Sequence, residues 1–282
     1  MDYGHDLQFG TFITPRNSPP QAPVELARLS ERLGYDLVAF QDHPYQPRFH
    51  DTWTLLSYVA AATSKIQLAP DVANLPLRQP AVLARAAASL DLLSGGRLNL
   101  GLGAGGFWDA IEAMGGRRLT PGRSVDALAE AIDIIHGIWD PEEREPLHGG
   151  ELYPVRGAKR GPAPAHRIPI WIGGYKPRML RLTGRKADGW LPSLGYLQLA
   201  DLADGNARID DAATDAGRDP RDVRRVLNIS GDEGADAIVV LAVEHGFSTF
   251  ISGGDDPTAA ERYAAEVIPA VREAVAAERA RR

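Results

Sequence analysis

Eight short apolar segments, each followed by a stretch with helical periodicity, constrain the fold of this chain more than any other feature of its sequence. Most of these segments are rich in leucine, isoleucine, valine and phenylalanine, a composition typical of strands covered on both faces. The predicted strands cover residues 7–13, 37–40, 66–69, 98–102, 168–172, 189–192, 223–229 and 248–251. Eight strand-then-helix steps indicate an α/β protein with a closed parallel (β/α)₈ TIM barrel, with a doubly wound open sheet as the alternative.

The helical segments between these strands carry the boundary residues that helices require. Gly34 is suited to a left-handed cap, Pro80 to a first helical turn, and Gly95 with Gly96 to a helix end. A chain of 282 residues fits one barrel of about 250 residues, so we predict a single domain over residues 1–282. Residues 140–167 form a Pro- and Gly-rich excursion before strand 5, in which residues 151–155 are one predicted arm of an irregular hairpin.

The amino-acid composition excludes several kinds of binding partner and of catalytic chemistry. The hydrophobic fraction is 44%, the net charge is −6 and cysteine is absent. The negative charge argues against nucleic acid as a partner, and the lack of cysteine excludes disulfides and cysteine nucleophiles. We find no membrane-spanning run, no signal peptide and no metal-binding motif, and therefore expect a cytoplasmic protein with no membrane partner and no metal.

The fifth strand-to-helix step carries a possible anion site. Gly173 and Gly174 end the strand, and the helix that starts near Lys176 lacks a Ser, Thr, Asp or Asn cap. Lys176 and Arg178 place two cations in a first turn where acidic residues are normally favoured. Free N–H groups, glycines and cations together indicate a phosphate site, whereas an ordinary turn with solvated cations is the alternative.

Polar or glycine-rich residues follow three other strands, at the end where barrel ligands bind. Asp42 and His43 follow the second strand, and a carboxylate that orients an imidazole is suited to proton transfer; the alternative is a helix cap beside a surface histidine. The segment from Asp71 and Val72 to Asn74 is a weaker candidate after the third strand. The segment 103–106, which includes Gly103, Ala104 and Gly105, would let a flat ligand approach the backbone.

Taken together, these segments resemble the bacterial luciferase-like monooxygenase superfamily, which includes FMN-dependent monooxygenases and oxidoreductases that use coenzyme F420. The resemblance covers most of the chain. It rests on the order and spacing of segments 34–43, 75–84, 90–97, 101–105, 169–174 and 184–190. The fold of that superfamily is a (β/α)₈ barrel, which agrees with the independent strand count.

The resemblance implies roles for the candidate residues. Gly173, Gly174, Lys176 and Arg178 would hold the cofactor phosphate, and residues 103–105 would lie along the flavin. A non-proline cis peptide that supports the ring would fall at Asp71-Val72, and His43 with Asp42 would act near the reacting carbon. Some F420-using relatives have a glutamate directly after the strand-four glycine loop, where this chain has Gly106, and that difference argues against a sugar-phosphate dehydrogenase.

We therefore expect a cytoplasmic FMN- or F420-dependent oxidoreductase that acts on a small organic substrate, with F420 slightly favoured because of Asp42-His43. The reaction would be hydride transfer to or from F420, or oxygen activation by reduced FMN. Two alternatives stay open: a non-redox phosphate-binding barrel enzyme, such as an aldolase or isomerase, and a flavin-binding module without turnover. The resemblance also favours a homodimer.

Overall fold

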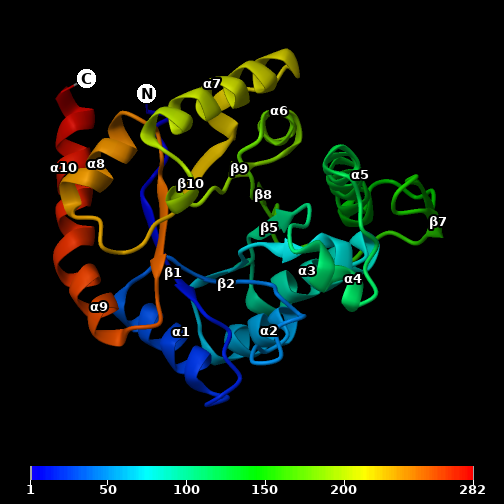
Figure 1. Ribbon diagram of the computed structural model, residues 1–282, viewed down its shortest axis with the longest axis horizontal. Coiled ribbons are helices and arrows are strands. Elements are labelled where there is room, and N and C mark those ends of the chain that lie inside the picture. The colour runs from blue at the N-terminus through cyan, green and yellow to red at the C-terminus, as the bar shows by residue number, and fades with distance from the viewer. Residues whose placement is uncertain (1, 282) are drawn as a thin grey trace.

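A computed structural model describes residues 2–281. Its main sheet is parallel and runs in the order β3-β2-β1-β11-β10-β9-β8-β5-β4. The strands are β1 (Gln8–Ile13), β2 (Leu37–Phe40), β3 (Gln67–Pro70), β4 (Ala73–Asn74), β5 (Leu100–Gly103), β8 (Ile170–Ile172), β9 (Gly189–Trp190), β10 (Arg224–Asn228) and β11 (Thr249–Gly253). In Figure 1 the helices surround these strands.

The two ends of this sheet meet, and so the barrel closes. A parallel bridge joins Leu68 of β3 to Leu98, and β4 pairs with β5 through Ala73 and Leu102. β3 and β4 are successive parts of one barrel position, interrupted at Asp71-Val72, where the peptide bond is cis. The sheet therefore has eight barrel positions, and the predicted (β/α)₈ barrel is confirmed.

Helices alternate with the strands, as the strand-then-helix pattern of the sequence predicts. The helices are α1 (Ala22–Leu33), α2 (Thr52–Ala62), α3 (Pro80–Ser94), α4 (Trp108–Ala113), α5 (Pro121–Trp139), α6 (Pro177–Lys186), α7 (Leu199–Asp215), α8 (Ala235–Val243), α9 (Pro257–Arg262) and α10 (Ile268–Arg281). Helix α4 is additional to the eight strand-then-helix steps, and a π-helical segment at Tyr263–Val267 separates α9 from α10. Gly34 caps α1 in the left-handed region, as expected, with a φ of 84°.

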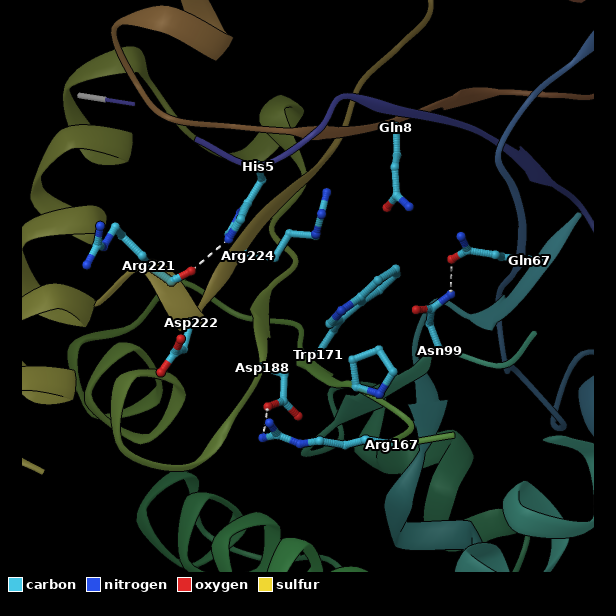
Figure 2. A pocket seen from close by; sticks show the side chains of 11 residues that line it. His5, Gln8, Gln67, Asn99, Arg167, Trp171, Asp188, Arg221, Asp222 and Arg224 are labelled. Carbon is cyan, nitrogen blue, oxygen red and sulfur yellow. Dashed lines mark hydrogen bonds and ion pairs between the residues drawn. The ribbon is translucent and has the colours of Figure 1, made fainter. Parts of the chain in front are cut away.

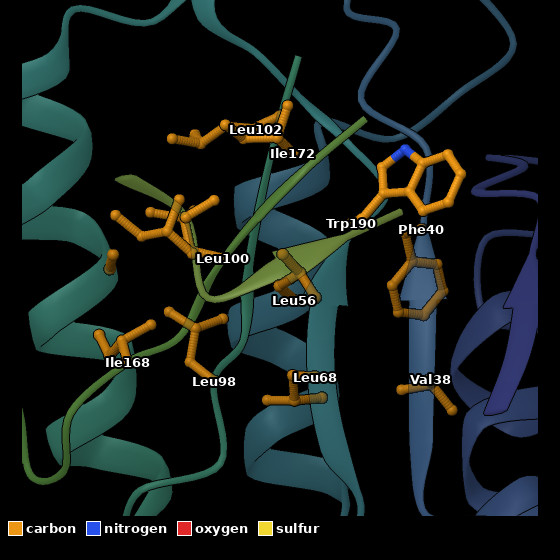
Figure 3. Close-up of a cluster of buried hydrophobic side chains, with 14 of the residues drawn as sticks. Val38, Phe40, Leu56, Leu68, Leu98, Leu100, Leu102, Ile168, Ile172 and Trp190 are labelled. Carbon is orange, nitrogen blue, oxygen red and sulfur yellow. The ribbon is translucent and has the colours of Figure 1, made fainter. Parts of the chain in front are cut away.

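Side chains alternate between the inside of the barrel and the surrounding helices. Leu37 and Ala39 of β2 belong to the inner cluster, together with Trp171 of β8. Their neighbours Val38 and Phe40 belong to the larger core, part of which Figure 3 shows between the strands and the helices. This alternation within fully buried strands explains why their sequences are continuous apolar runs.

The excursion forms a two-stranded antiparallel hairpin of β6 (Leu147–Gly149) and β7 (Val155–Ala158). The predicted hairpin exists, but the predicted arm at residues 151–155 was wrong: only Val155 lies in a strand. The reason is Glu130 of α5, whose carboxylate accepts hydrogen bonds from the backbone N–H groups of Glu151 at 2.6 Å and Leu152 at 3.1 Å. Those groups are therefore not available to a β ladder.

Across residues 2–281, every helix is too short or too polar to cross a membrane.

Candidate active site

A cavity of about 600 Å³ opens at the carboxyl ends of the barrel strands, where the ligands of (β/α)₈ barrels bind. It brings together ten of the twelve residues that the sequence singled out. The lining comprises Phe12, Gln41, Asp42, His43, Tyr45, Asp71, Val72, Ala73, Asn74, Gly103, Ala104, Gly105, Gly106, Phe107, Gly173, Gly174, Tyr175, Met179, Leu191, Pro192, Ser193, Tyr196 and Asn228.

Asp42 is held by Arg78 and not by His43. Its carboxylate accepts hydrogen bonds from Nε and Nη2 of Arg78, each at 2.6 Å, and from the backbone N–H of Asn74 at 2.8 Å. Within residues 2–281 no hydrogen bond joins Asp42 to the imidazole of His43. The expectation that Asp42 orients His43 by direct contact is therefore corrected: Asp42 anchors the loop that carries His43, because a bidentate guanidinium pair uses both of its oxygens.

His43 stands in an aromatic group. Its ring stacks on Tyr45 with ring centroids 5.2 Å apart, and it meets Phe107 edge-to-face with ring centroids 5.3 Å apart. Burial lowers the pKa of His43, and the nearby negative charge of Asp42 partly opposes that effect. No hydrogen bond from residues 2–281 holds its ring nitrogens. A neutral imidazole is thus available to a ligand in the cavity.

The side chain of Val72 packs against three glycines and forms an apolar surface, called the Val72 floor below. A Cβ atom on Gly103 would lie 2.6 Å from Cγ2 of Val72, and Cβ atoms on Gly101 and Gly173 would lie 3.1 and 3.2 Å from its Cγ1. Only glycine at Gly103 leaves room for the valine without displacement. The cis peptide expected at Asp71-Val72 is present, and the side chain that follows it presents an apolar surface to the cavity.

The glycine-rich segment after β5 has a packing role as well. Gly105 has a φ of 99°, and a Cβ atom there would lie 2.8 Å from the ring of Trp108 and 2.9 Å from Pro76. Trp108 therefore packs beneath the segment, whereas Phe107 lines the cavity and is 63% exposed at its rim.

The start of α6 keeps only part of the predicted anion site. Lys176 occupies the cap position, Pro177 begins the helix, and no side chain caps it, as expected. Gly173 and Gly174 line the cavity, but Lys176 and Arg178 do not. Arg178 instead forms an ion pair with Asp126 of α5 at 2.7 Å, and Nζ of Lys176 lies 5.1 Å from the ring centroid of Tyr175. The two cations thus do not converge with the glycines on one point.

The lining residues that sequence reasoning missed include the polar residues Tyr45, Ser193 and Asn228. Nδ2 of Asn228 lies 3.3 Å from Oγ of Ser193, and Asn228 is the last residue of β10. A polar residue at the carboxyl end of a predicted apolar strand was the available signal for Asn228. Tyr45 lies two residues after His43, in the loop between β2 and α2.

A second cavity, of about 370 Å³, lies at the opposite end of the barrel, where the strands begin (Figure 2). Gln8, Gln67 and Arg224 are the first residues of β1, β3 and β10, and Trp171 separates this cavity from the barrel interior. Arg167 pairs with Asp188 at 2.6 Å. Because the ligands of (β/α)₈ barrels bind at the other end, the cavity around His43 is the candidate active site.

A sequence model described as luciferase-like monooxygenase matches residues 7–282. The chain belongs to the luciferase-like monooxygenase family. The resemblance stated from the sequence is thereby confirmed, and with it membership of a family of F420- or FMN-dependent oxidoreductases and monooxygenases.

Curated relatives of this luciferase-like protein include two reductases. The 5,10-methylenetetrahydromethanopterin reductase of Archaeoglobus fulgidus is 32% identical over 257 residues, which are 88% of this chain and 72% of that protein. The phthiodiolone/phenolphthiodiolone dimycocerosates ketoreductase of Mycobacterium bovis is 35% identical over 205 residues, which are 69% of this chain and 50% of the ketoreductase. The chain therefore matches about half the length of the second relative.

Solved structures share the fold. An F420-dependent secondary alcohol dehydrogenase, in complex with an F420-acetone adduct, superposes with a TM-score of 0.83 at 19% identity and covers 95% of this chain and 99% of that chain. A riboflavin lyase with modified FMN also has a TM-score of 0.83, at 17% identity, covering 96% of this chain and 92% of that one. Structures of this luciferase-like fold thus include proteins with either type of cofactor.

Proposed function

We propose that this protein is an F420-dependent oxidoreductase that transfers hydride between the bound cofactor and a small uncharged alcohol or carbonyl compound, with His43 as acid and base. The observation that carries the proposal is the position of His43: a neutral imidazole lies in the same cavity as the Val72 floor. Reduced FMN that activates oxygen is the second candidate, since the family includes FMN-dependent proteins.

The cavity fits a flat cofactor with a polar edge. Val72 and the three glycines around it offer a broad apolar surface with little side chain. Buried polar atoms without a partner in residues 2–281 include Oδ1 of Asn74 and Oδ1 of Asn228, and both residues line the cavity. An apolar face flanked by unsatisfied polar groups is what a ring with carbonyl and N–H groups on one edge requires.

The residues of this chain would supply positioning and proton transfer. The cofactor, when bound, supplies a carbon that accepts or gives hydride. During oxidation of an alcohol, a ring nitrogen of His43 would accept the hydroxyl proton while the alcohol carbon gives up its hydride. In the reverse direction His43 returns that proton to the carbonyl oxygen. The preference for F420 rests on the resemblance of the Asp42-His43 sequence after β2 to that of F420-using relatives, and two solved structures of this fold are F420-dependent by name.

The substrate class follows from the charges around the cavity. Neither lysine nor arginine is among its lining residues, and Arg78 beside it is occupied by Asp42. A phosphorylated or carboxylated substrate would therefore lack a cation in the lining. Tyr45, Phe107 and Tyr196 give the rim an aromatic character that suits an uncharged organic molecule. The absence of lysine from the lining also argues against the Schiff-base type of aldolase.

The test is a titration of the purified protein with F420 and with FMN separately, followed by fluorescence of each cofactor. We expect F420 to bind in the micromolar range and to be reduced on addition of a secondary alcohol. His43→Ala should bind F420 as before and lose turnover. Binding of FMN alone, with oxygen consumption, would favour the monooxygenase candidate. Failure of both cofactors to bind, together with binding of a sugar phosphate, would exclude redox function.

A further inference from the structure

Three buried oxygen atoms in the cavity have no hydrogen-bond partner within residues 2–281. They are Oδ2 of Asp71, Oδ1 of Asn74 and Oδ1 of Asn228, and all three residues line the cavity around His43. More than nine in ten buried backbone polar groups, and most buried side-chain ones, have a partner in folded proteins. These atoms are therefore available as hydrogen-bond acceptors to a ligand that occupies the cavity.

Asp71 differs from the other carboxylate of the cavity, Asp42. Both carboxylate oxygens of Asp42 accept hydrogen bonds from Arg78, and the negative charge of this fully buried side chain is compensated by the guanidinium. Asp71 has no such cation, because the lining contains neither lysine nor arginine. An ionised carboxylate at Asp71 would thus be a buried charge without compensation, which is costly, whereas a neutral carboxyl is tolerated.

The surroundings of Asp71 agree with a neutral carboxyl. Burial raises the pKa of Asp71 to about 7, and the Asn228 amide pulls it back only in part. The other titratable or charged groups that face the cavity come from three places. They are Asp42 with its partner Arg78, His43 and Tyr45 around the loop after β2, Tyr175 before α6, and Tyr196 in the 3₁₀ turn Leu194–Tyr196.

We propose that Asp71 is a further binding residue for the flavin-type cofactor and contacts the polar edge of its ring as a neutral carboxyl, so that cofactor binding is linked to a proton on Asp71. This inference rests on the proposed function. A neutral carboxyl donates an O–H to a ring carbonyl oxygen, whereas an ionised one can only accept and repels that oxygen. The two cofactor types share this edge, so the inference holds for F420 and for FMN.

Cofactor affinity should decrease as the pH rises. If the cofactor binds the protein only when Asp71 is protonated, its affinity is constant below the pKa of Asp71, near 7. Above that value the affinity falls, by up to about tenfold for each pH unit. Asparagine at this position keeps the shape of the side chain and carries an N–H donor that does not titrate.

The experiment is a titration of cofactor into wild-type protein, Asp71→Asn and His43→Gln between pH 5.5 and about 8.5, with the dissociation constant measured by fluorescence. Wild type and His43→Gln should lose at least tenfold in affinity above pH 7, and Asp71→Asn should lose none beyond the titration of the cofactor itself. The titration of the cofactor affects all three proteins alike. Differences between their pH profiles therefore measure the contribution of ionisable groups of the protein. Circular dichroism checks that each variant is folded.

Two outcomes would overturn the inference while leaving the proposed function in place: profiles of wild type and Asp71→Asn that coincide, or a pH dependence that disappears in His43→Gln instead. Should Asp71→Asn fail to fold, Asp71→Ser replaces it, since serine also removes the titrating group and keeps a donor. If neither F420 nor FMN binds wild type or the variant at any pH, the proposed function fails, and this inference fails with it.

Discussion

Arg78 binds Asp42 through two hydrogen bonds of 2.6 Å each, and the Asp42 side chain is fully buried by this contact. The same guanidinium reaches Asp51, the cap residue of α2, at 2.7 Å. One arginine thus ties together the loop that carries His43, the start of α2 and, through the Asn74 N–H bonded to Asp42, strand β4. The position of His43 depends on this ion-pair network.

The first prediction concerns this network. Arg78→Ala leaves the Asp42 carboxylate buried without its cation, so the free energy of unfolding should fall by about 3–5 kcal/mol. Unfolding in urea, monitored by circular dichroism, measures this free energy. Arg28→Ala is the matched control, because Arg28 pairs with Glu25 on the exposed surface of α1, where loss of the pair should cost less than about 1 kcal/mol. Equal losses of unfolding free energy in the two variants would show that the Asp42–Arg78 pair stabilises the protein no more than an exposed surface pair does.

His43 gives the second prediction. Burial lowers its pKa below the ordinary 6.5, and the oxidation of an alcohol needs the neutral imidazole as base. The value of kcat/KM for oxidation should therefore rise as pH increases through a pKa below 6.5 and stay level above it, up to the region where Asp71 affects cofactor binding. A pH–rate profile in the oxidative direction measures this. An inflection well above 6.5, retained in His43→Gln, would assign the proton transfer to another group.

The barrel could be predicted because each step carries its own local signals. The β2 segment Leu37–Phe40 is buried throughout and is bounded by Gly34 and Asp42, so its sequence alone identifies a short strand. The order of eight such segments then leaves few topologies. The residues at the strand ends, including His43, Val72 and Gly103, could be assigned to one cavity for the same reason.

Side-chain partners could not be predicted in this way. Asp42 and His43 are adjacent in sequence, and adjacency favoured a contact between them. Asp42 instead bonds to Arg78, 36 positions away, and a pairing of that range depends on how the loops fold over the strand ends. Arg178 likewise lies beside the glycines in sequence but reaches across to Asp126 of α5, a residue that no local pattern connects to it.

The ion pair of Arg178 leads to the third prediction. If Arg178 holds the cofactor phosphate, as the sequence implied, it must leave Asp126 to do so. Both side chains are about half exposed, so the ion pair contributes little to stability and breaking it costs little free energy. Arg178→Ala should then weaken binding of whichever cofactor the wild type binds, F420 or FMN, about tenfold. Binding of the phosphate-free form of that cofactor, which is riboflavin in the case of FMN, should be unaffected. Asp126→Asn should strengthen cofactor binding slightly. Equal effects on the cofactor and on its phosphate-free form would remove Arg178 from the phosphate site.

Gly103 and Gly106 provide the fourth prediction as a matched pair. A Cβ atom at Gly103 would lie 2.6 Å from Val72, whereas one at Gly106 would meet nothing within 4 Å. Gly103→Ala should displace Val72 and lower cofactor affinity at least tenfold, while Gly106→Ala should change it less than about twofold. Fluorescence titration measures both. Similar affinities for the two variants would show that the Val72 floor does not support the cofactor.

Asp71 carries a fifth prediction, which concerns stability without cofactor. Its folded-state pKa of about 7 lies above the ordinary value near 4, so the folded protein binds more protons than the unfolded chain between these values. For this one group, stability falls as pH rises from about 4 to 7 and is constant above. Asp71→Asn removes this pH-dependent loss of stability. The free energy of unfolding of the variant, relative to that of wild type, should therefore increase with pH, by at most about 4 kcal/mol at pH 8. Urea unfolding of both proteins at pH 5 and pH 8 measures the change. A difference between variant and wild type that stays the same at both pH values would show that Asp71 ionises freely in the folded protein.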